Sequence, residues 1–100
     1  DNAPLLIVEV VSQSTRKKDN TLKRLSYQTL PSLEEYVLIE QDFVDVEMCR
    51  RSKHWWPEHY YLGDVVHFAS IDLTLSVEDI YARVMNDDMQ AYRKNTINYE

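Results

Sequence analysis

An apolar stretch near the start of the chain contains a single carboxylate, Glu9. The stretch, residues 5–11, is rich in β-branched side chains and apolar at both alternating sets of positions, which is typical of a strand covered on both faces. Glu9 is then expected to be buried, where an ionised carboxylate is costly unless a cation, a metal ion or good hydrogen bonds compensate. A structural lysine or backbone amide and a divalent cation are about equally good partners at this point.

Three side chains on the following segment could serve this carboxylate. Asp19, Lys23 and Tyr27 are spaced four residues apart, which places them on roughly one stripe of a helix. If that helix packs back against the strand, the long side chain of Lys23 can reach Glu9. The competing interpretation makes Lys23 a surface residue paired with Asp19 one turn earlier, and Tyr27 a tyrosine at the rim of the core.

A helix is therefore expected between the first strand and Pro31. The hydroxyl side chains within residues 12–15 can cap its start, and the helix should run from about residue 16 to about residue 30. Its apolar periodicity predicts that it turns three residues toward the core: Leu22, Leu25 and Thr29.

Strands are expected after this helix. Residues 35–40 have the apolar composition of a second buried strand, and residues 44–48 alternate as a half-exposed third strand that forms a hairpin with it. Further strands are expected over residues 59–62 and 65–68, on either side of a turn at Gly63-Asp64. Ser76 is expected to cap a final helix, followed by a polar tail from Asn86 that is frayed helix or disordered.

Composition limits the class of protein. One hundred residues, 44% of them hydrophobic, with one Gly and three Pro, indicate a single globular domain. No apolar run approaches the roughly 20 residues that span a bilayer, and no signal peptide precedes the first strand, so we expect a cytoplasmic protein with no membrane contact. The chain starts at Asp1 without Met, and we expect that a longer protein has lost its amino-terminal part.

The net charge of -6 is unevenly distributed. Residues 1–24 contain five basic and three acidic residues, whereas residues 25–100 contain six basic and fourteen acidic residues. A phosphate-contacting surface, if the chain has one, is expected around the start of the first helix, although a solvated helix end explains the same charges. The acidic remainder argues against sequence-independent coating of nucleic acid.

Other reactive side chains lack the patterns that chemistry requires. The histidines have no Cys or paired acid at zinc-like spacing, so they are expected at the surface or the edge of the core. Cys49 is the only cysteine and has no neighbouring His or helix start, which predicts an unreactive thiol.

These motifs together resemble the bacterial Uma-two family, whose members are classed as restriction endonucleases of the PD-(D/E)XK nuclease superfamily. The resemblance covers about residues 4–85. It rests on the E-V-V-S-Q-S-T block at residues 9–15, the D-x3-K-x3-Y spacing at residues 19–27 and the E-Y-V-L-I-E strand at residues 35–40. The resemblance implies an α/β, restriction-endonuclease-like fold: a mixed sheet with a strand-helix-strand-strand core, partial at the amino terminus, with residues 86–100 as a polar tail.

The resemblance also implies a metal-dependent site that hydrolyses phosphodiester bonds of DNA. Glu9 matches the second acidic ligand of Mg²⁺ or Mn²⁺, and the carbonyl oxygen of Val10 or Val11 would complete the metal shell. Because Val11 stands where the superfamily usually has its lysine, Lys23 on the helix matches that role. The remaining matched residues would bind phosphate or support the site: Ser12, Ser14, Thr15, Asp19 and Tyr27.

The chain departs from the family pattern at the first metal-binding Asp, which the family carries on a strand upstream of Glu9. Asp1 is too close in sequence to take that role, so a metal ion should bind weakly here. Two hypotheses remain: a metal-dependent endonuclease that is incomplete in this chain, and a non-catalytic remnant of the fold that acts as a binding or dimerisation module. The sheet edge left open next to the first strand favours a homodimer or another homo-oligomer.

Overall fold

The computed structural model describes residues 3–12, 23–82, 84 and 86–98. Its centre is a four-stranded mixed sheet in the order β1-β2-β3-β4. Helical residues 23–28 lie in the connection between β1 and β2, which pair in parallel, and such a connection is what a parallel pair requires. The antiparallel β2–β3 pair confirms the expected hairpin. The order of the elements confirms the α/β class with a strand-helix-strand-strand core. The strands are β1 (Leu6–Val11), β2 (Glu35–Glu40), β3 (Val46–Arg50) and β4 (Pro57–Tyr60).

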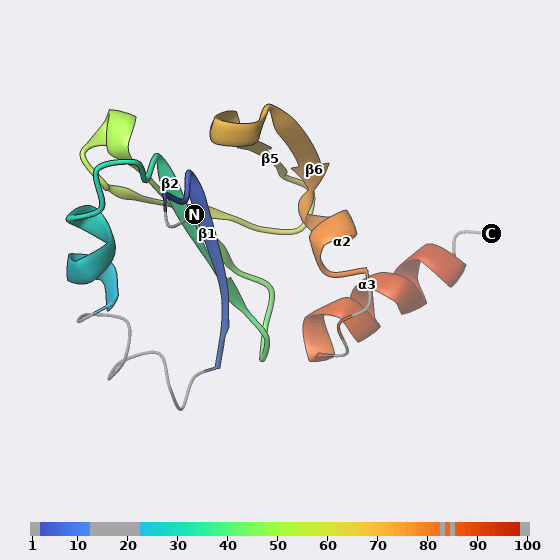
Figure 1. The fold of residues 1–100 in the computed structure, drawn as a ribbon. Coiled ribbons are helices and arrows are strands. Elements are labelled where there is room, and N and C mark those ends of the chain that lie inside the picture. Colours follow the sequence, from blue (N-terminus) through green and yellow to red (C-terminus); the bar gives the residue numbers. More distant parts are fainter. Residues whose placement is uncertain (1–2, 13–22, 83, 85, 99–100) are drawn as a thin grey trace.

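The helix at residues 23–28 lies on one side of this sheet, and residues 65–80 and 87–98 lie on the other (Figure 1). On the helix face, Leu33, Tyr36 and Cys49 form a small buried cluster against which Tyr27 and Leu30 pack. We call this the helix face of the sheet.

The predicted inward face of the helix is wrong. The Leu25 side chain is 59% exposed and Thr29 is exposed, while Leu22 lies outside the described residues. Arg24 and Tyr27 turn toward the sheet instead, because the strands below them present carboxylates with which both side chains form hydrogen bonds. The sheet-facing side of this helix therefore combines polar contacts with the packing of Tyr27 on the small cluster, and it does not follow the apolar periodicity.

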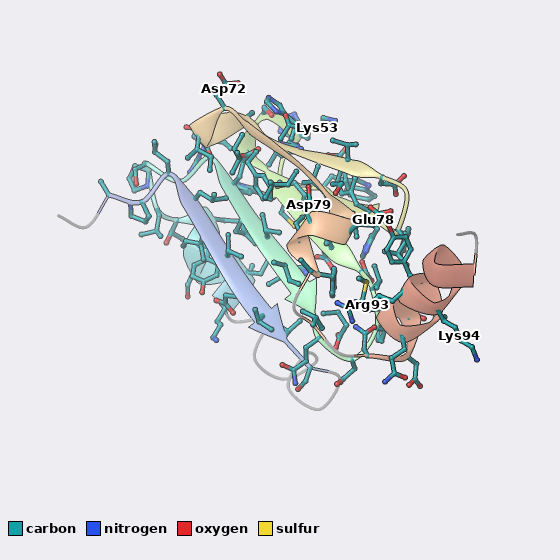
Figure 2. The ribbon with its side chains drawn as sticks, turned by 90° about the vertical axis from the view of Figure 1, so that its right-hand side faces the viewer. Lys53, Asp72, Glu78, Asp79, Arg93 and Lys94 are labelled. Carbon is teal, nitrogen blue, oxygen red and sulfur yellow. The ribbon has the colours of Figure 1, made fainter. Side chains whose placement is uncertain are left out.

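The opposite face, which we call the hairpin face, carries the main apolar core. It is covered by the antiparallel hairpin of β5 (Val65–Phe68) and β6 (Leu73–Ser76), by α2 (Val77–Ile80) and by α3 (Asp87–Asn98). Figure 2 looks onto this side, with Glu78 and Asp79 on α2 and Arg93 on α3. The core residues are nearly inaccessible to solvent: Val37, Val44, Val46, Met48, Val66, Phe68, Val77, Tyr81 and Met89.

Hydrogen bonds of two buried side chains, Tyr81 and Glu35, connect the elements of the hairpin face to the sheet. The Tyr81 hydroxyl donates to the carbonyl of Glu40 at 2.5 Å and accepts the backbone N–H of Asp45 at 3.1 Å. The Glu35 side chain, 2% exposed, accepts the Ser70 backbone N–H at 2.9 Å. Two 3-10 helices, Arg51–Lys53 and Ala69–Ile71, lie beside Glu35.

The Ser76 cap, the tail from Asn86 and the third strand bear on three further predictions. The Ser76 side chain accepts the backbone N–H of Asp79 and caps α2, as predicted. The tail is a helix where the structure describes it, α3, which Met89 anchors in the core. The half-exposed third strand is wrong: β3 is buried on both faces, because the helix covers one face and the hairpin covers the other.

The expectation that β1 is covered on both faces is also wrong. β1 is an edge strand of the described sheet, and the side chains of Val8 and Val10 are 49% and 64% exposed. Both point to the side opposite the helix, where Leu6 of β1 packs against the main core while Val8 and Val10 stay exposed. Within the described residues, no helix has the length and apolar composition needed to cross a membrane.

Candidate functional site

Glu9 is the centre of a small polar cluster between β1 and the helix. Lys23 Nζ lies 3.3 Å from Glu9 Oε2, and the Tyr27 hydroxyl donates a hydrogen bond to Glu9 Oε1. The Glu9 side chain is 17% exposed and that of Lys23 is 51% exposed. The structure thus brings together the carboxylate, the ammonium and the phenol that the spacing of the sequence placed on facing elements, and it leaves the ammonium accessible to an anionic ligand.

A second carboxylate lies on the same face, two strands away. Glu9 on β1 is in register with Leu38 on β2, which is in register with Glu47 on β3. Because side chains in register point to the same side of a sheet, both carboxylates face the helix. Arg24 on the helix forms an ion pair with Glu47.

Glu47 belongs to a network with the neighbouring strand. His59 on β4 places Nε2 3.8 Å from Glu47 Oε1, and its Nδ1 lies 2.8 Å from Asp45 Oδ1. The Cys49 thiol donates to Glu47 Oε2 at 3.7 Å. His59 is at the edge of the core as the sequence predicted, and this network of acids, histidine and arginine gives the buried carboxylates polar partners.

The donor set around Glu9 does not fit a complete metal site. In the part of the chain that the structure describes, no group of three His, Cys, Asp or Glu side chains could hold a metal ion. Both Glu9 oxygens already accept hydrogen bonds, and the Val11 carbonyl accepts the backbone N–H of Gln41 at 2.8 Å. The Val10 side chain points to the opposite side of the sheet from Glu9, so its backbone carbonyl alone remains as the predicted ligand. A metal ion would find one carboxylate here and would need acidic ligands from elsewhere.

The other predicted residues are placed only in part. Ser12 follows β1 and is half-buried. The predicted residues Ser14, Thr15 and Asp19 lie outside the described residues, and so does the alternative pairing of Lys23 with Asp19.

Sequence reasoning missed Arg24 and Glu47. The signal was present: Asp45, Glu47 and Cys49 alternate with the apolar Val44, Val46 and Met48. Such alternation marks one polar face of a strand, but it was interpreted as solvent exposure. Only the register across three strands shows that this face points toward the helix that carries Lys23.

Burial governs the two reactive groups beneath the helix. Burial raises the pKa of the Cys49 thiol, with the neighbouring Glu47 carboxylate adding to the effect. Burial likewise raises the pKa of Tyr36. Both groups stay protonated at neutral pH, so Cys49 agrees with the prediction of an unreactive thiol.

The comparison with known families decides the class of protein. Residues 1–78 match the Uma2 family, described as "Putative restriction endonuclease". The chain belongs to this family. The resemblance inferred from residues 4–85 is confirmed, and the mixed sheet is compatible with a restriction-endonuclease-like fold.

A relative extends this finding. The chain is 31% identical over 80 residues to a Synechocystis protein with the printed name "Uncharacterized protein slr1290". The match covers 78% of the present chain and 42% of the relative, so the chain spans less than half the length of that protein. No solved structure matches the chain.

Proposed function

We propose that this chain carries the Glu9–Lys23 part of an endonuclease site that hydrolyses phosphodiester bonds in DNA with the help of Mg²⁺ or Mn²⁺. The observation that supports it most directly is the convergence of Lys23 and Tyr27 on the Glu9 carboxylate in a member of this family. The two oxygens of one carboxylate are oriented by two different donors, which fixes its plane.

The chemistry available to these residues is electrostatic. The Lys23 ammonium, 51% exposed, can hold a scissile phosphate and stabilise the negative charge that develops on it during hydrolysis. Glu9 keeps that ammonium in place, and Tyr27 fixes the carboxylate. The divalent cation needs an acid beyond Glu9, so we expect the isolated chain to bind Mg²⁺ weakly, with a dissociation constant on the order of 1 mM or above.

The direct test is nicking of supercoiled plasmid DNA in buffer with Mg²⁺ or Mn²⁺. We expect slow nicking that EDTA stops and that Glu9→Ala and Lys23→Ala each abolish, because each removes one charge of the pair. Tyr27→Phe should reduce the rate roughly tenfold, since it removes one hydrogen bond to Glu9. The matched control is Lys53→Ala, which removes a 56% exposed lysine that pairs with Glu58 away from the site. Nicking that survives both Glu9→Ala and Lys23→Ala would exclude this site.

Among the described residues, Glu9 is the only carboxylate of this cluster, which favours a second candidate, a non-catalytic remnant of the nuclease fold that acts as a binding or dimerisation module. A folded wild-type chain that shows no nicking in either metal, yet binds a DNA duplex or self-associates, would support this candidate over the first. A binding titration by fluorescence anisotropy and the plasmid assay on the same preparation separate the two.

The open edge of β1 supports a homodimer as the assembly. Val8 and Val10 are exposed there, beside an apolar groove formed with Phe68 and Leu73, and no Lys or Pro blocks strand pairing along β1. Light scattering after gel filtration should give twice the chain mass, and Val8→Lys should return it to the monomer mass. A monomer at all concentrations would contradict the proposal.

A further inference from the structure

The helix at residues 23–28 is attached to two carboxylates that lie on different strands. Glu9 on β1 and Glu47 on β3 are separated by the intervening Leu38 of β2. Since neighbouring strands are about 4.8 Å apart, the two positions lie roughly 10 Å from each other across the sheet. The helix contacts both, through Lys23 and Tyr27 at one and Arg24 at the other.

The geometry of a helix places these attachments at different angles around its axis. Tyr27 lies about 40° from Lys23, and Arg24 lies about 100° from Lys23 and about 60° from Tyr27. Contacts at a single angle leave the helix free to rotate about its axis. Contacts spread over about 100° restrict that rotation, and the rotation decides whether Lys23 and Tyr27 reach Glu9.

The two attachments differ in rigidity. Lys23 is half exposed, and an exposed ion pair of this kind contributes little to orientation. The Glu47 side chain is only 6% exposed and is in contact with Cys49 and His59, so its carboxylate has a fixed position. Apolar packing of this helix is limited, because Tyr27 packs against the small buried cluster while Leu25 points to solvent. The arginine therefore pairs with the more buried of the two carboxylates.

We infer that Arg24 is a positioning residue: its ion pair with Glu47 sets the rotation of the helix and so holds Lys23 and Tyr27 on Glu9. The catalytic meaning of this inference rests on the proposed function, but the geometric part does not. Glu47 in turn acts through Arg24 and contributes no group to the DNA site.

The test combines kinetics with NMR on four variants of the 100-residue chain. We expect Arg24→Met and Glu47→Gln each to lower kcat for plasmid nicking roughly 10- to 100-fold, the scale of a misplaced functional group. KM for the plasmid should stay within about twofold, because neither residue is expected to contact DNA. The double variant should be no worse than the poorer single variant, and Arg24→Lys, which keeps the charge, should recover part of the loss.

In the NMR arm, nuclear Overhauser contacts between the Tyr27 ring and the Glu9 methylene groups are expected in the wild type and should disappear in Arg24→Met. The matched control is Arg93→Met, which removes an arginine that bonds Val84 and Ala82 carbonyls on the hairpin face. It should change neither kcat nor the contacts. Far-UV circular dichroism identifies any variant that fails to fold. If Arg24→Met fails to fold, kcat and the Tyr27–Glu9 contacts of Arg24→Lys test the inference instead.

The outcomes separate this inference from the proposed function. Wild-type kcat or retained Tyr27–Glu9 contacts in folded Arg24→Met would overturn the inference and leave the proposed function standing. A wild-type chain that does not nick DNA, together with contacts that disappear in Arg24→Met, would overturn the function and support the inference.

Discussion

The two faces of the sheet are held by different forces. The hairpin face is a continuous apolar core, in which Val46, Met48 and Val66 are inaccessible to solvent. The helix face has only a small apolar cluster, and beside it a row of acids that bind the helix through Arg24, Lys23 and Tyr27. Apolar burial is non-directional and stabilises the fold, whereas ion pairs and hydrogen bonds fix orientation. The face that supplies most of the apolar burial is therefore distinct from the face that carries the polar cluster around Glu9.

The largest expected effect comes from the apolar core. Met48→Ala should lower the free energy of unfolding by about 3 kcal/mol, because it leaves a cavity among fully buried neighbours. Urea denaturation followed by circular dichroism measures this loss. Met48→Leu, which conserves volume, is the control and should cost less than about 1.5 kcal/mol. A loss for Met48→Ala no larger than that of the control would mean that the hairpin face is not the main source of stability.

A smaller loss is expected from the polar exception on the hairpin face. Glu35 binds Arg50 and accepts the backbone N–H groups of Ala69 and Ser70. Glu35→Ala should cost about 2 kcal/mol, since these donors lose their acceptor. It should also speed amide hydrogen exchange at residues 69 and 70. The control is Glu34→Ala at the exposed neighbour, which should change neither the free energy of unfolding nor the exchange rates. Equal effects for the two substitutions would mean that the Glu35 contacts do not stabilise the fold.

The smallest effect belongs to a partly exposed pair at the rim of the hairpin face, where Glu58 on β4 is in register with Met48. A hydrogen bond from Lys53 lowers the pKa of Glu58, so the pair stabilises the fold at pH values above the ordinary carboxyl pKa and loses this contribution as the pH falls through the lowered pKa. Lys53→Met should cost about 0.5 kcal/mol at pH 7.

The loss should shrink in acid and in high salt, where the carboxylate is protonated or screened. Urea midpoints at several pH values measure it. A loss that grows toward low pH would contradict the assigned direction of the pKa shift.

The order of the elements could be predicted from the sequence, because strand and helix periods are local properties. Residues 35–40 and the Ser76 cap were found in this way. The inward face of the helix could not be predicted from its own residues. Arg24 faces the sheet because it pairs with the buried Glu47, and the helix sequence does not show where Glu47 lies. The exposure of β1 and the burial of β3 likewise depend on strand order, which no local pattern contains.

By itself, the sequence determined which chemistry is available near Glu9: one carboxylate, with Lys23 and Tyr27 on the next element at a spacing that lets both reach it. Only the tertiary structure decided that Glu47 lies on the same face and pairs with Arg24, and that Val8 and Val10 on β1 are exposed. The physical reason is the sequence separation of the interacting residues. Spacing along a helix fixes contacts within one or two elements, whereas strand register and burial depend on packing between strands that are distant in the sequence.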